Sequence, residues 1–283
     1  MKLLRVGELG HERPALLDGQ GGLRDLSAHV SDIGGSSLLP GNLAKLRDLN
    51  LDSLPLITGN PRYGACVGGI GKIVCVGLNY SDHAAESKMP IPAEPILFLK
   101  PTSSIAGPND DVEIPLGAEK TDWEVELGVV IGKPGKYVAL DRALEHVAGY
   151  CVVNDVSERS YQLERGGQWD KGKGCDTFAP IGPWLVTPDE IQDPQSLDMW
   201  LDVDGQRFQT GNTRTMIFTV QHLVSYISHF MSLRTGDVIA TGTPPGVGLG
   251  QKPPRYLKAG QTMRVGIAGL GEQLQRSVPA TVL

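Results

Sequence analysis

Residues 121–131 place two glutamates inside a strongly apolar stretch, and no other feature constrains the fold of this chain as much. The alternation of apolar and charged residues predicts a β-strand with Glu124 and Glu126 on one face and apolar side chains on the other. Two carboxylates on one face repel each other unless a positive charge lies between them. A hard divalent cation such as Mg²⁺ or Mn²⁺ would supply that charge, because these ions prefer oxygen ligands. The same alternation is also typical of a half-exposed strand with a polar outer face, so the segment alone leaves both interpretations open.

Glycine and proline interrupt the rest of the chain. The 36 glycines and 20 prolines make up about a fifth of the 283 residues, a level that predicts many short strands joined by turns and not a low-complexity chain. One long helix is expected over residues 220–231, with Thr219 as its N-cap, because apolar residues recur there at helical spacing. Strand candidates lie at residues 72–77, 96–99, 112–114, 123–131, 150–153, 183–186, 197–203, 237–241 and 263–267. We therefore expect a mainly β (α+β) protein.

The first 70 residues differ in pattern from the remainder. Their short apolar pieces are cut by glycine and proline, and only a brief helical pattern follows at residues 43–49. A glycine-rich connector over residues 64–71 then precedes the first strand of a larger unit. The sequence thus predicts a small N-terminal domain, residues 1–70, and a larger domain, residues 71–283.

Charge and composition exclude several classes of function. The formal charge is −6 and the chain has no basic block, so we expect a small-molecule ligand and no nucleic acid. The four cysteines are far apart and form no C-x-x-C pair, which argues against a zinc knuckle or a redox pair. The N-terminus lacks the apolar run of a signal peptide, and no stretch approaches the roughly 18 apolar residues of a membrane span. A cytoplasmic protein without a membrane partner is expected.

Residues 77–86 follow a predicted strand and are predicted to open a short helix capped by Ser81 or Asp82. On such a helix His83 and Glu86, three residues apart, lie on the same side. A carboxylate in contact with an imidazole orients the ring and raises its basicity, which a general base for water requires. An ordinary surface His/Glu pair has the same spacing, and the sequence does not distinguish the two.

Three more parts of the sequence are candidates for metal binding, catalysis or substrate binding. Asp155 follows an apolar strand candidate and could join the two glutamates at a metal site, or serve as a common turn or helix cap. Lys173 stands between glycines, where its ammonium could face an anion or a developing enolate, or solvent. The Gly/Pro turn at residues 241–248 offers backbone donors suited to a carboxylate. It is not a phosphate loop, because no Gly-Lys-Ser/Thr follows at the required spacing.

The motifs described above, taken in their order along the chain, resemble those of the fumarylacetoacetate hydrolase superfamily over most of residues 72–268. The resemblance implies a fumarylacetoacetate hydrolase-like mixed β-sandwich roll and commonly a homodimer, or a higher homo-oligomer. It also implies a Mg²⁺ ion, with Mn²⁺ as the alternative, held by Glu124, Glu126 and Asp155. The matching motifs are Gly77-Leu-Asn-Tyr80 with His83 and Glu86, Glu124-Val-Glu126, Asn154-Asp-Val-Ser-Glu-Arg159, Lys173 in Lys-Gly-Cys-Asp-Thr-Phe, and the turn at residues 241–248.

Members of this superfamily act on 2-oxo acids, typically acylpyruvates, by hydrolytic carbon–carbon cleavage, while some isomerise, hydrate or decarboxylate related compounds. For this chain the resemblance implies that His83 activates water, that Glu86 orients His83, and that Lys173 stabilises a pyruvate enolate. It favours Lys173 over Lys171 for that role. Implied substrate contacts are Tyr80, Arg159, Gln162, Thr241, Gly242 and Thr243.

The resemblance is greatest to bacterial members that hydrolyse 2,4-diketo-3-deoxy sugar acids derived from L-rhamnonate or L-fuconate, giving pyruvate and a hydroxy acid such as lactate. The polar segment at residues 157–170 suits a hydroxylated acidic substrate, or forms a solvated lid. Three functions remain open: a Mg²⁺-dependent hydrolase of carbon–carbon bonds, an isomerase, hydratase, decarboxylase or ureidoglycolate lyase-like enzyme on a related 2-oxo acid, and a non-catalytic metal-dependent binding protein.

Overall fold

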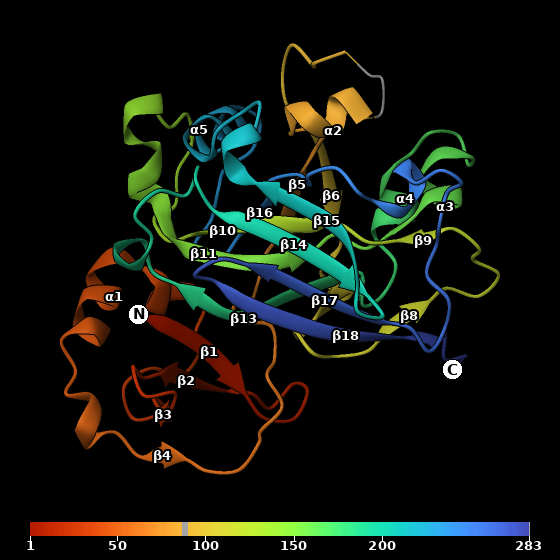
Figure 1. Ribbon diagram of the computed structural model, residues 1–283. Helices are drawn as coiled ribbons and strands as arrows, with labels where there is room; N and C mark the ends of the chain where they lie inside the picture. The colour runs from red at the N-terminus through yellow and green to blue at the C-terminus, as the bar shows by residue number, and fades with distance from the viewer. Residues whose placement is uncertain (87–89, 283) are drawn as a thin grey trace.

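The computed structural model describes residues 1–86 and 90–282, which are mostly sheet with few helices (Figure 1). In its largest sheet, the first strand of the chain pairs with a strand that ends at Val186. In spatial order its strands are β4 (Leu56–Ile57), β3 (Leu23–Asp25), β2 (Arg13–Leu17), β1 (Lys2–Val6), β13 (Ala179–Val186), β11 (Val147–Asn154), β10 (Val125–Ile131), β16 (Val238–Ala240), β5 (Ile73–Gly77) and β6 (Ile96–Lys100), with β7 (Ile105–Ala106) paired to β13.

Two smaller sheets complete the β structure. A five-stranded sheet has the order β15 (Gln206–Asn212), β14 (Asp198–Val203), β17 (Thr262–Ile267), β18 (Gly271–Pro279) and β8 (Val112–Ile114). A two-stranded sheet pairs β9 (Thr121–Asp122) with β12 (Ser157–Glu158). The helices are α1 (Pro40–Arg47), α2 (Ser81–Glu86), α3 (Arg159–Leu163), α4 (Asp170–Lys173) and α5 (Val220–Phe230).

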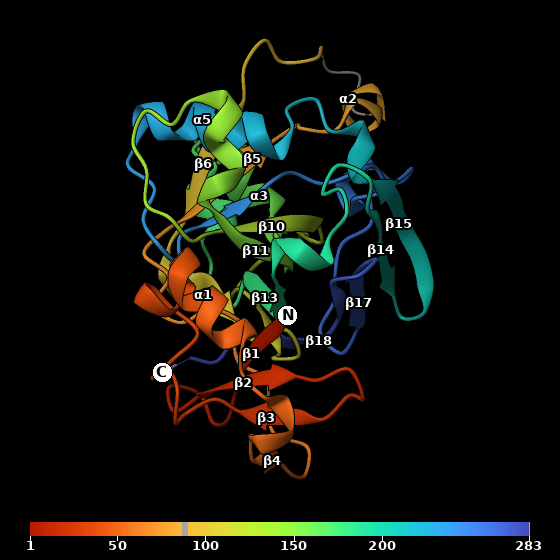
Figure 2. The same ribbon diagram turned by 90° about the vertical axis from the view of Figure 1, so that its left-hand side faces the viewer.

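The two large sheets pack face to face, and the main hydrophobic core lies between them. Val125 and Leu127 of β10 belong to the same buried cluster as Leu201 of β14 and Val265 of β17. Figure 2 shows the five-stranded sheet as a separate layer beside β10, β11 and β13, with α1 on the other side of these strands. This is the sandwich expected for a mainly β (α+β) chain, because each sheet buries one apolar face.

Both faces of the segment at residues 121–131, the apolar one and the one that carries the glutamates, are buried in the structure. Trp123 and Val125 lie in the core between the sheets, whereas Glu124 and Glu126 line a cavity on the other side. The exposed fractions of the two glutamates are 6% and 2%, so the half-exposed strand with a polar outer face is wrong. The regular strand begins at Val125 and not at Trp123.

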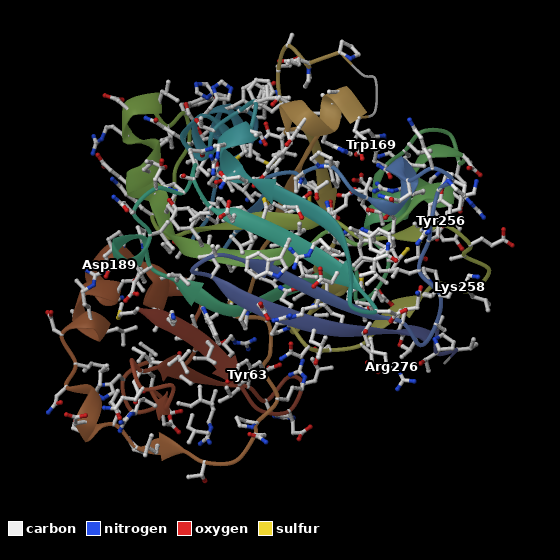
Figure 3. The ribbon with its side chains drawn as sticks, viewed as in Figure 1. Tyr63, Trp169, Asp189, Tyr256, Lys258 and Arg276 are labelled. Carbon is white, nitrogen blue, oxygen red and sulfur yellow. The ribbon has the colours of Figure 1, made fainter. Side chains whose placement is uncertain are left out.

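The N-terminal segment continues the main sheet. Strand β1 pairs antiparallel with β13, and Leu38 and Leu43 share a buried cluster with Cys151 of β11. At the surface, Arg47 Nη2 donates a hydrogen bond to Asp189 Oδ1 at 2.7 Å, beside α1 in Figure 3. These contacts join residues 1–57 to the rest of the molecule through one sheet. The division into domains at residue 70 stays a prediction.

The sequence pattern predicted helix α5 correctly but did not predict strand β18. Helix α5 begins at Val220, and the Thr219 side chain accepts a hydrogen bond from the His222 N–H, as predicted. Strand β18 was not expected, because its alternation is inverted: Gln273 and Gln275 are buried while Leu274 is 56% exposed. The Gln273 amide donates to the Val152 carbonyl at 2.8 Å, which satisfies the buried polar group.

The cysteines contribute to the packing of the interior. All four cysteines are free, three of them buried and Cys175 half-buried. The buried thiols serve as small apolar side chains in the core. Across residues 1–86 and 90–282, the helices are too short or too polar to cross a bilayer.

Gly149 tests the packing between β11 and β13. A Cβ at this position would overlap the backbone oxygen of Val186 in β13, so Gly149→Ala forces the two strands apart. We expect it to lower the free energy of unfolding by about 2 kcal/mol or more, measured by urea unfolding. Gly41→Ala is the control, because nothing lies within 4 Å of its Cβ and alanine favours α1. An unchanged stability of Gly149→Ala would contradict this packing.

Candidate active site and metal centre

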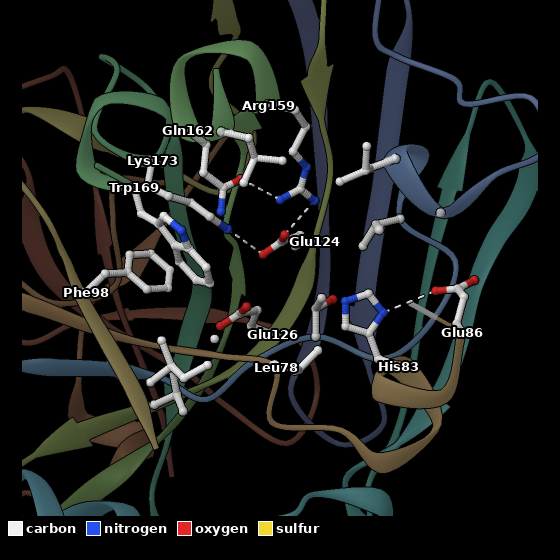
Figure 4. Close-up of a pocket in the computed structure, with 18 of the residues that line it drawn as sticks. Leu78, His83, Glu86, Phe98, Glu124, Glu126, Arg159, Gln162, Trp169 and Lys173 are labelled. Atoms are coloured by element: carbon white, nitrogen blue, oxygen red, sulfur yellow. Dashed lines mark hydrogen bonds and ion pairs between the residues drawn. The ribbon is translucent and has the colours of Figure 1, made fainter. Parts of the chain in front are cut away.

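A cavity of about 530 Å³ lies where strands β5, β6 and β10 meet helices α2, α3 and α4. The segment after β16 completes its wall with Thr243 and residues 247–252. Figure 4 shows the charged groups that line it, with Arg159, Lys173 and Glu124 on one side and His83 with Glu86 on the other. The cavity therefore brings together residues from five separate parts of the chain.

Three carboxylates meet beside this cavity. Glu124, Glu126 and Asp155 each offer an oxygen, and these oxygens lie within 4.8 Å of one another. They converge because β10 and β11 are paired antiparallel, with Val125 opposite Asn154, and because the Asp155 N–H donates to the Glu124 carbonyl at 2.9 Å. Asp155 is fully buried, and α3 is capped by Glu158 instead. The position of Asp155 is therefore not that of a helix cap.

Six buried side chains form a continuous chain of alternating charge, which we call the ion chain. Its members, in spatial order, are Asp122, Arg159, Glu124, Lys173, Asp155 and Lys100. The guanidinium of Arg159 lies 2.8 Å from Asp122 and 2.6 Å from Glu124. The Lys173 ammonium lies 2.7 Å from Glu124 and 2.8 Å from Asp155, and Lys100 lies 2.5 Å from the other Asp155 oxygen. Three acids and three bases thus compensate one another, as buried charges require.

Glu126 lies beside the ion chain without a cation of its own. Among the described residues it takes part in no ion pair, and it accepts a hydrogen bond from the Gly242 N–H at 2.9 Å. Burial, together with the charges of Asp155 and Glu124, raises the pKa of Glu126 well above its usual range. By contrast, burial alone would raise the pKa of Glu124, but Lys173 and Arg159 lower it to about 2. The site therefore has one more carboxylate than it has cations.

A divalent metal ion fits this donor set. Glu124, Glu126 and Asp155 offer only carboxylate oxygens, which suit hard cations such as Mg²⁺ and Mn²⁺. The raised pKa of Glu126 indicates that its ionised form lacks a compensating positive charge. A bound cation would supply that charge. These three residues can hold the metal, and no soft ligand stands among them.

His83 and Glu86 form a hydrogen-bonded pair in the cavity wall. Helix α2 begins at Ser81, and His83 Nδ1 lies 3.1 Å from Glu86 Oε2. The Gly246 N–H donates to the same oxygen at 3.2 Å. The hydrogen bond from His83 lowers the pKa of Glu86, although burial opposes this. Both residues line the cavity, and the other ring nitrogen of His83 points toward its centre (Figure 4), so they are not an ordinary surface pair.

The segment at residues 157–170 is partly buried and not only a solvated lid. Arg159 and Gln162 are 5% and 4% exposed, and both line the cavity. The Arg159 Nη1 group donates to the Gln162 amide oxygen at 3.0 Å. Two residues that the sequence suggested as substrate contacts therefore lie side by side in the wall.

Lys173 lies at the end of the one-turn helix α4 and not in an open loop. The preceding glycine has a packing role, because a Cβ at Gly172 would overlap the backbone of Glu158 and Gln162 where α4 meets α3. Lys173 is 2% exposed, whereas Lys171 points away and donates to the Arg165 carbonyl at 2.9 Å. The structure thus places Lys173, and not Lys171, beside the carboxylates.

The remaining suggested substrate contacts are engaged with the protein itself. The hydroxyls of Thr241 and Thr243 donate to the carbonyls of Leu127 and Val125 at 2.9 and 2.8 Å. Only Thr243 of this trio lines the cavity, while the Gly242 N–H is directed to Glu126. Tyr80 is fully buried, and its hydroxyl contacts the Met199 sulfur at 3.2 Å. Tyr80 therefore presents no surface to the cavity.

Lys100 and Asp122 belong to the ion chain, yet sequence analysis did not single them out. Lys100 ends an apolar strand, as many exposed lysines do, and its partner Asp155 is 55 residues away. Asp122 also accepts hydrogen bonds from the N–H groups of Gly248 and Leu249 at 2.6 and 2.9 Å. In the sequence, Lys100 is visible only as a charged residue at the end of an apolar run. This pattern does not reveal a partner that lies far away in the chain.

Comparison with known proteins identifies relatives of this chain. Residues 72–278 match the family described as Fumarylacetoacetate (FAA) hydrolase C-terminal. A Burkholderia multivorans protein is 66% identical over 276 residues, covering 97% of this chain and 98% of the relative, and its name contains the word hydrolase but no substrate.

Solved structures extend this similarity to the whole fold. The fumarylacetoacetate hydrolase of psychrophilic Exiguobacterium antarcticum is 35% identical, covers 99% of this chain and 100% of its own, and has a TM-score of 0.87. Maleylpyruvate hydrolase from Sphingobium sp. SYK-6, in complex with manganese(II) and pyruvate, is 28% identical with coverages of 99% and 100% and a TM-score of 0.83. The 2-hydroxyhepta-2,4-diene-1,7-dioate isomerase of Mycobacterium marinum is 32% identical with full coverage of both chains and a TM-score of 0.75.

Because Lys100 belongs to the ion chain, we expect its removal to lower the free energy of unfolding strongly. In Lys100→Met the Asp155 carboxylate stays buried but loses one of its two cations, so we expect unfolding to become easier by about 3–5 kcal/mol. Urea unfolding measures this. Lys133→Met is the matched control, because the Lys133 side chain is 45% exposed and its ion pair with Glu145 is long, at 3.7 Å; little change is expected there. Equal, small effects of both substitutions would contradict a structural role of the ion chain.

The raised pKa of Glu126 predicts pH-dependent metal binding. Protons and the cation compete for the same carboxylate oxygens, so Mn²⁺ affinity should fall as the pH drops below this pKa. In that range binding should release a proton, and the release should disappear as the pH rises through the pKa. Titration calorimetry in buffers of different ionisation enthalpy measures both quantities. An affinity independent of pH, with no proton release, would show that Glu126 is not a ligand.

Proposed function

Because the chain belongs to the fumarylacetoacetate hydrolase family, we propose that it is a divalent-metal-dependent hydrolase that cleaves a carbon–carbon bond in a 2,4-dioxo acid of the acylpyruvate type. One observation carries the proposal: Glu124 and Glu126, two members of the carboxylate triad, line the same cavity as the His83–Glu86 pair. A cation site without a base would suit simple binding of 2-oxo acids. A base positioned beside it suits the activation of water.

In the proposed reaction His83 removes a proton from water as the oxygen attacks the C4 carbonyl of the substrate. The C3–C4 bond then breaks, its electron pair remains on C3 as a pyruvate enolate, and C4 becomes a carboxylic acid. Protonation of C3 gives pyruvate, so water and substrate account for all product atoms. Glu86 holds the His83 ring through its 3.1 Å hydrogen bond and stabilises the imidazolium that forms.

Fixed charges of the cavity would bind and stabilise the pyruvate half. A divalent cation held by Glu124, Glu126 and Asp155 supplies positive charge to the substrate carboxylate and 2-oxo group. Burial opposes a charged Lys173, but Asp155 and Glu124 raise its pKa above the ordinary value. Its ammonium therefore stays charged through the reaction, where it can stabilise the enolate. Arg159 and Gln162 are the proposed partners of the substrate carboxylate.

Several finer assignments rest on sequence resemblance. They are Mg²⁺ as the resident ion, a homodimer or higher homo-oligomer in the cytoplasm, and a 2,4-diketo-3-deoxy sugar acid such as the L-rhamnonate derivative as substrate. Hydrolysis of that compound would give pyruvate and lactate. The match to maleylpyruvate hydrolase in complex with manganese(II) and pyruvate supports both the metal class and the pyruvate product.

Keto–enol isomerisation is the second candidate, favoured by the similarity to the Mycobacterium marinum isomerase. In that reaction His83 would help to move a proton between the enol oxygen and a carbon atom of the substrate, and no bond between carbons would break. The same metal site would serve. The two functions differ in their products, because an isomerase releases no acid fragment beside pyruvate.

An NMR product assay distinguishes these functions. Purified protein with Mg²⁺ and 2,4-diketo-3-deoxy-L-rhamnonate or acetylpyruvate should give pyruvate and the matching acid in equal amounts, and EDTA should abolish the reaction. His83→Ala should lower kcat by about 10²–10⁴-fold, the usual contribution of a general base. His229→Ala, on the outer face of α5, is the control and should retain full activity.

Two outcomes would contradict the proposed hydrolysis. Conversion of either compound without an acid fragment would assign isomerisation. Equal activity of His83→Ala and the unmodified protein would remove His83 from the mechanism.

A further inference from the structure

We infer that the substrate's acyl half, beyond C4, is a hydrocarbon group and not a hydroxylated or charged one. The inference rests on the proposed function and concerns the same cavity. It departs from the sugar-acid substrate that the sequence resemblance suggests, because within the 2,4-dioxo acids it places an alkyl or aryl acyl group above the lactoyl group. The basis is the distribution of polar and apolar side chains over the cavity wall.

The polar groups of the wall are concentrated where the pyruvate half would bind. Arg159, Gln162, Lys173 and the carboxylates form one pole, and His83 with Glu86 would contact the attacking water. Phe98 and Trp169 lie beside Lys173 at this pole. Much of the remaining wall is apolar, formed by Val76, Leu78, Ile96, Leu163, Val247 and Leu249. A cavity of about 530 Å³ is larger than pyruvate needs, so the acyl half would contact this apolar part.

Two leucines of this wall remain exposed to water. Leu163, at the end of α3, is 47% exposed, and Leu249, in the 3₁₀ turn Gly248–Gly250, is 39% exposed. They come from different segments, yet both line the cavity. A hydrocarbon group in contact with these leucines would remove apolar surface from water, which favours binding. A hydroxyl there would find no partner on either side chain.

The aromatic part of the wall is preorganised. Trp169 meets Phe98 edge to face, with ring centroids 5.5 Å apart. Its ring also lies against Gly77, where a Cβ would come within 2.6 Å of it. These contacts hold an apolar surface in place before a ligand arrives, so little ordering cost remains for binding.

The polar residues at the same end of the cavity have other partners. The Gln251 amide donates to the Val247 carbonyl at 3.4 Å. Lys252 lies close enough to contribute to the lowered pKa of Glu86, so its charge already acts on the catalytic pair. Recognition of an acyl group with a second carboxylate by Lys252 is therefore the competing outcome in the test.

Binding of N-substituted oxamates tests the inference without requiring turnover. Oxamate resembles pyruvate, and its N-propyl and N-(2-hydroxyethyl) derivatives differ only by a methyl in place of a hydroxyl. With Mn²⁺-loaded protein, titration calorimetry should show the propyl compound binding about 10–100-fold more tightly, the range for such isosteres in apolar pockets. N-carboxymethyl oxamate reports on Lys252, and it should bind more weakly than the propyl compound.

Leucine variants locate the effect within the cavity. Leu163→Ala and Leu249→Ala should each weaken the propyl compound by about fivefold while leaving unsubstituted oxamate unchanged. Leu144→Ala is the matched control, because Leu144 is 45% exposed but lies outside the cavity, and it should alter neither ligand.

Each alternative result has a distinct meaning. Equal or tighter binding of the hydroxyethyl or carboxymethyl compound would overturn the inference and leave the proposed hydrolysis standing. Loss of all discrimination in Leu144→Ala would also overturn it. Failure of every oxamate to bind in the presence of Mn²⁺ would refute the proposed 2-oxo acid site, and the inference with it.

Discussion

The compensation of buried charge by the ion chain is the constraint on which the site depends. Glu124 can stay ionised in the interior because Arg159 and Lys173 contact it directly and lower its pKa, and Asp155 pairs with Lys173 and Lys100. Without these cations, desolvation would favour protonation of the carboxylates. The ion chain leaves Glu126 without a cation, so the uncompensated charge is confined to one carboxylate at the cavity. This arrangement prepares the protein for a divalent ion.

The fold supplies this arrangement through strand pairing and through the segment after β16. Pairing of β10 with β11 brings Asp155 to the two glutamates. Four backbone N–H groups of residues 242–249 then donate to three acids of the site: Gly242 to Glu126, Gly246 to Glu86, and Gly248 and Leu249 to Asp122. Sequence analysis expected these donors to hold a substrate carboxylate. In the structure several of them hold the protein's own carboxylates, which fixes Glu126, Glu86 and Asp122 relative to one segment of the chain.

What the sequence could predict depended on local periodicity. The alternating faces around Glu124, the i, i+3 spacing of His83 and Glu86, and the amphipathic helix α5 are all short-range patterns, and the structure contains each of them. Long-range pairing left no such pattern. Lys100 resembled a surface lysine because its partner lies in another strand, and β18 escaped detection because its buried residues are glutamines that bond to the backbone of a neighbouring sheet. The apolar lining of the cavity likewise appears only after folding.

We propose that this cavity directs water to the C4 carbonyl of a 2,4-dioxo acid. Turnover of butyrylpyruvate in H₂¹⁸O with Mn²⁺, followed by mass spectrometry of the acid fragment, tests this proposal. We expect one ¹⁸O atom in each butyrate formed and one pyruvate for each butyrate. Consumption of the substrate without labelled butyrate, or no consumption of any acylpyruvate by the metal-loaded protein, would contradict it.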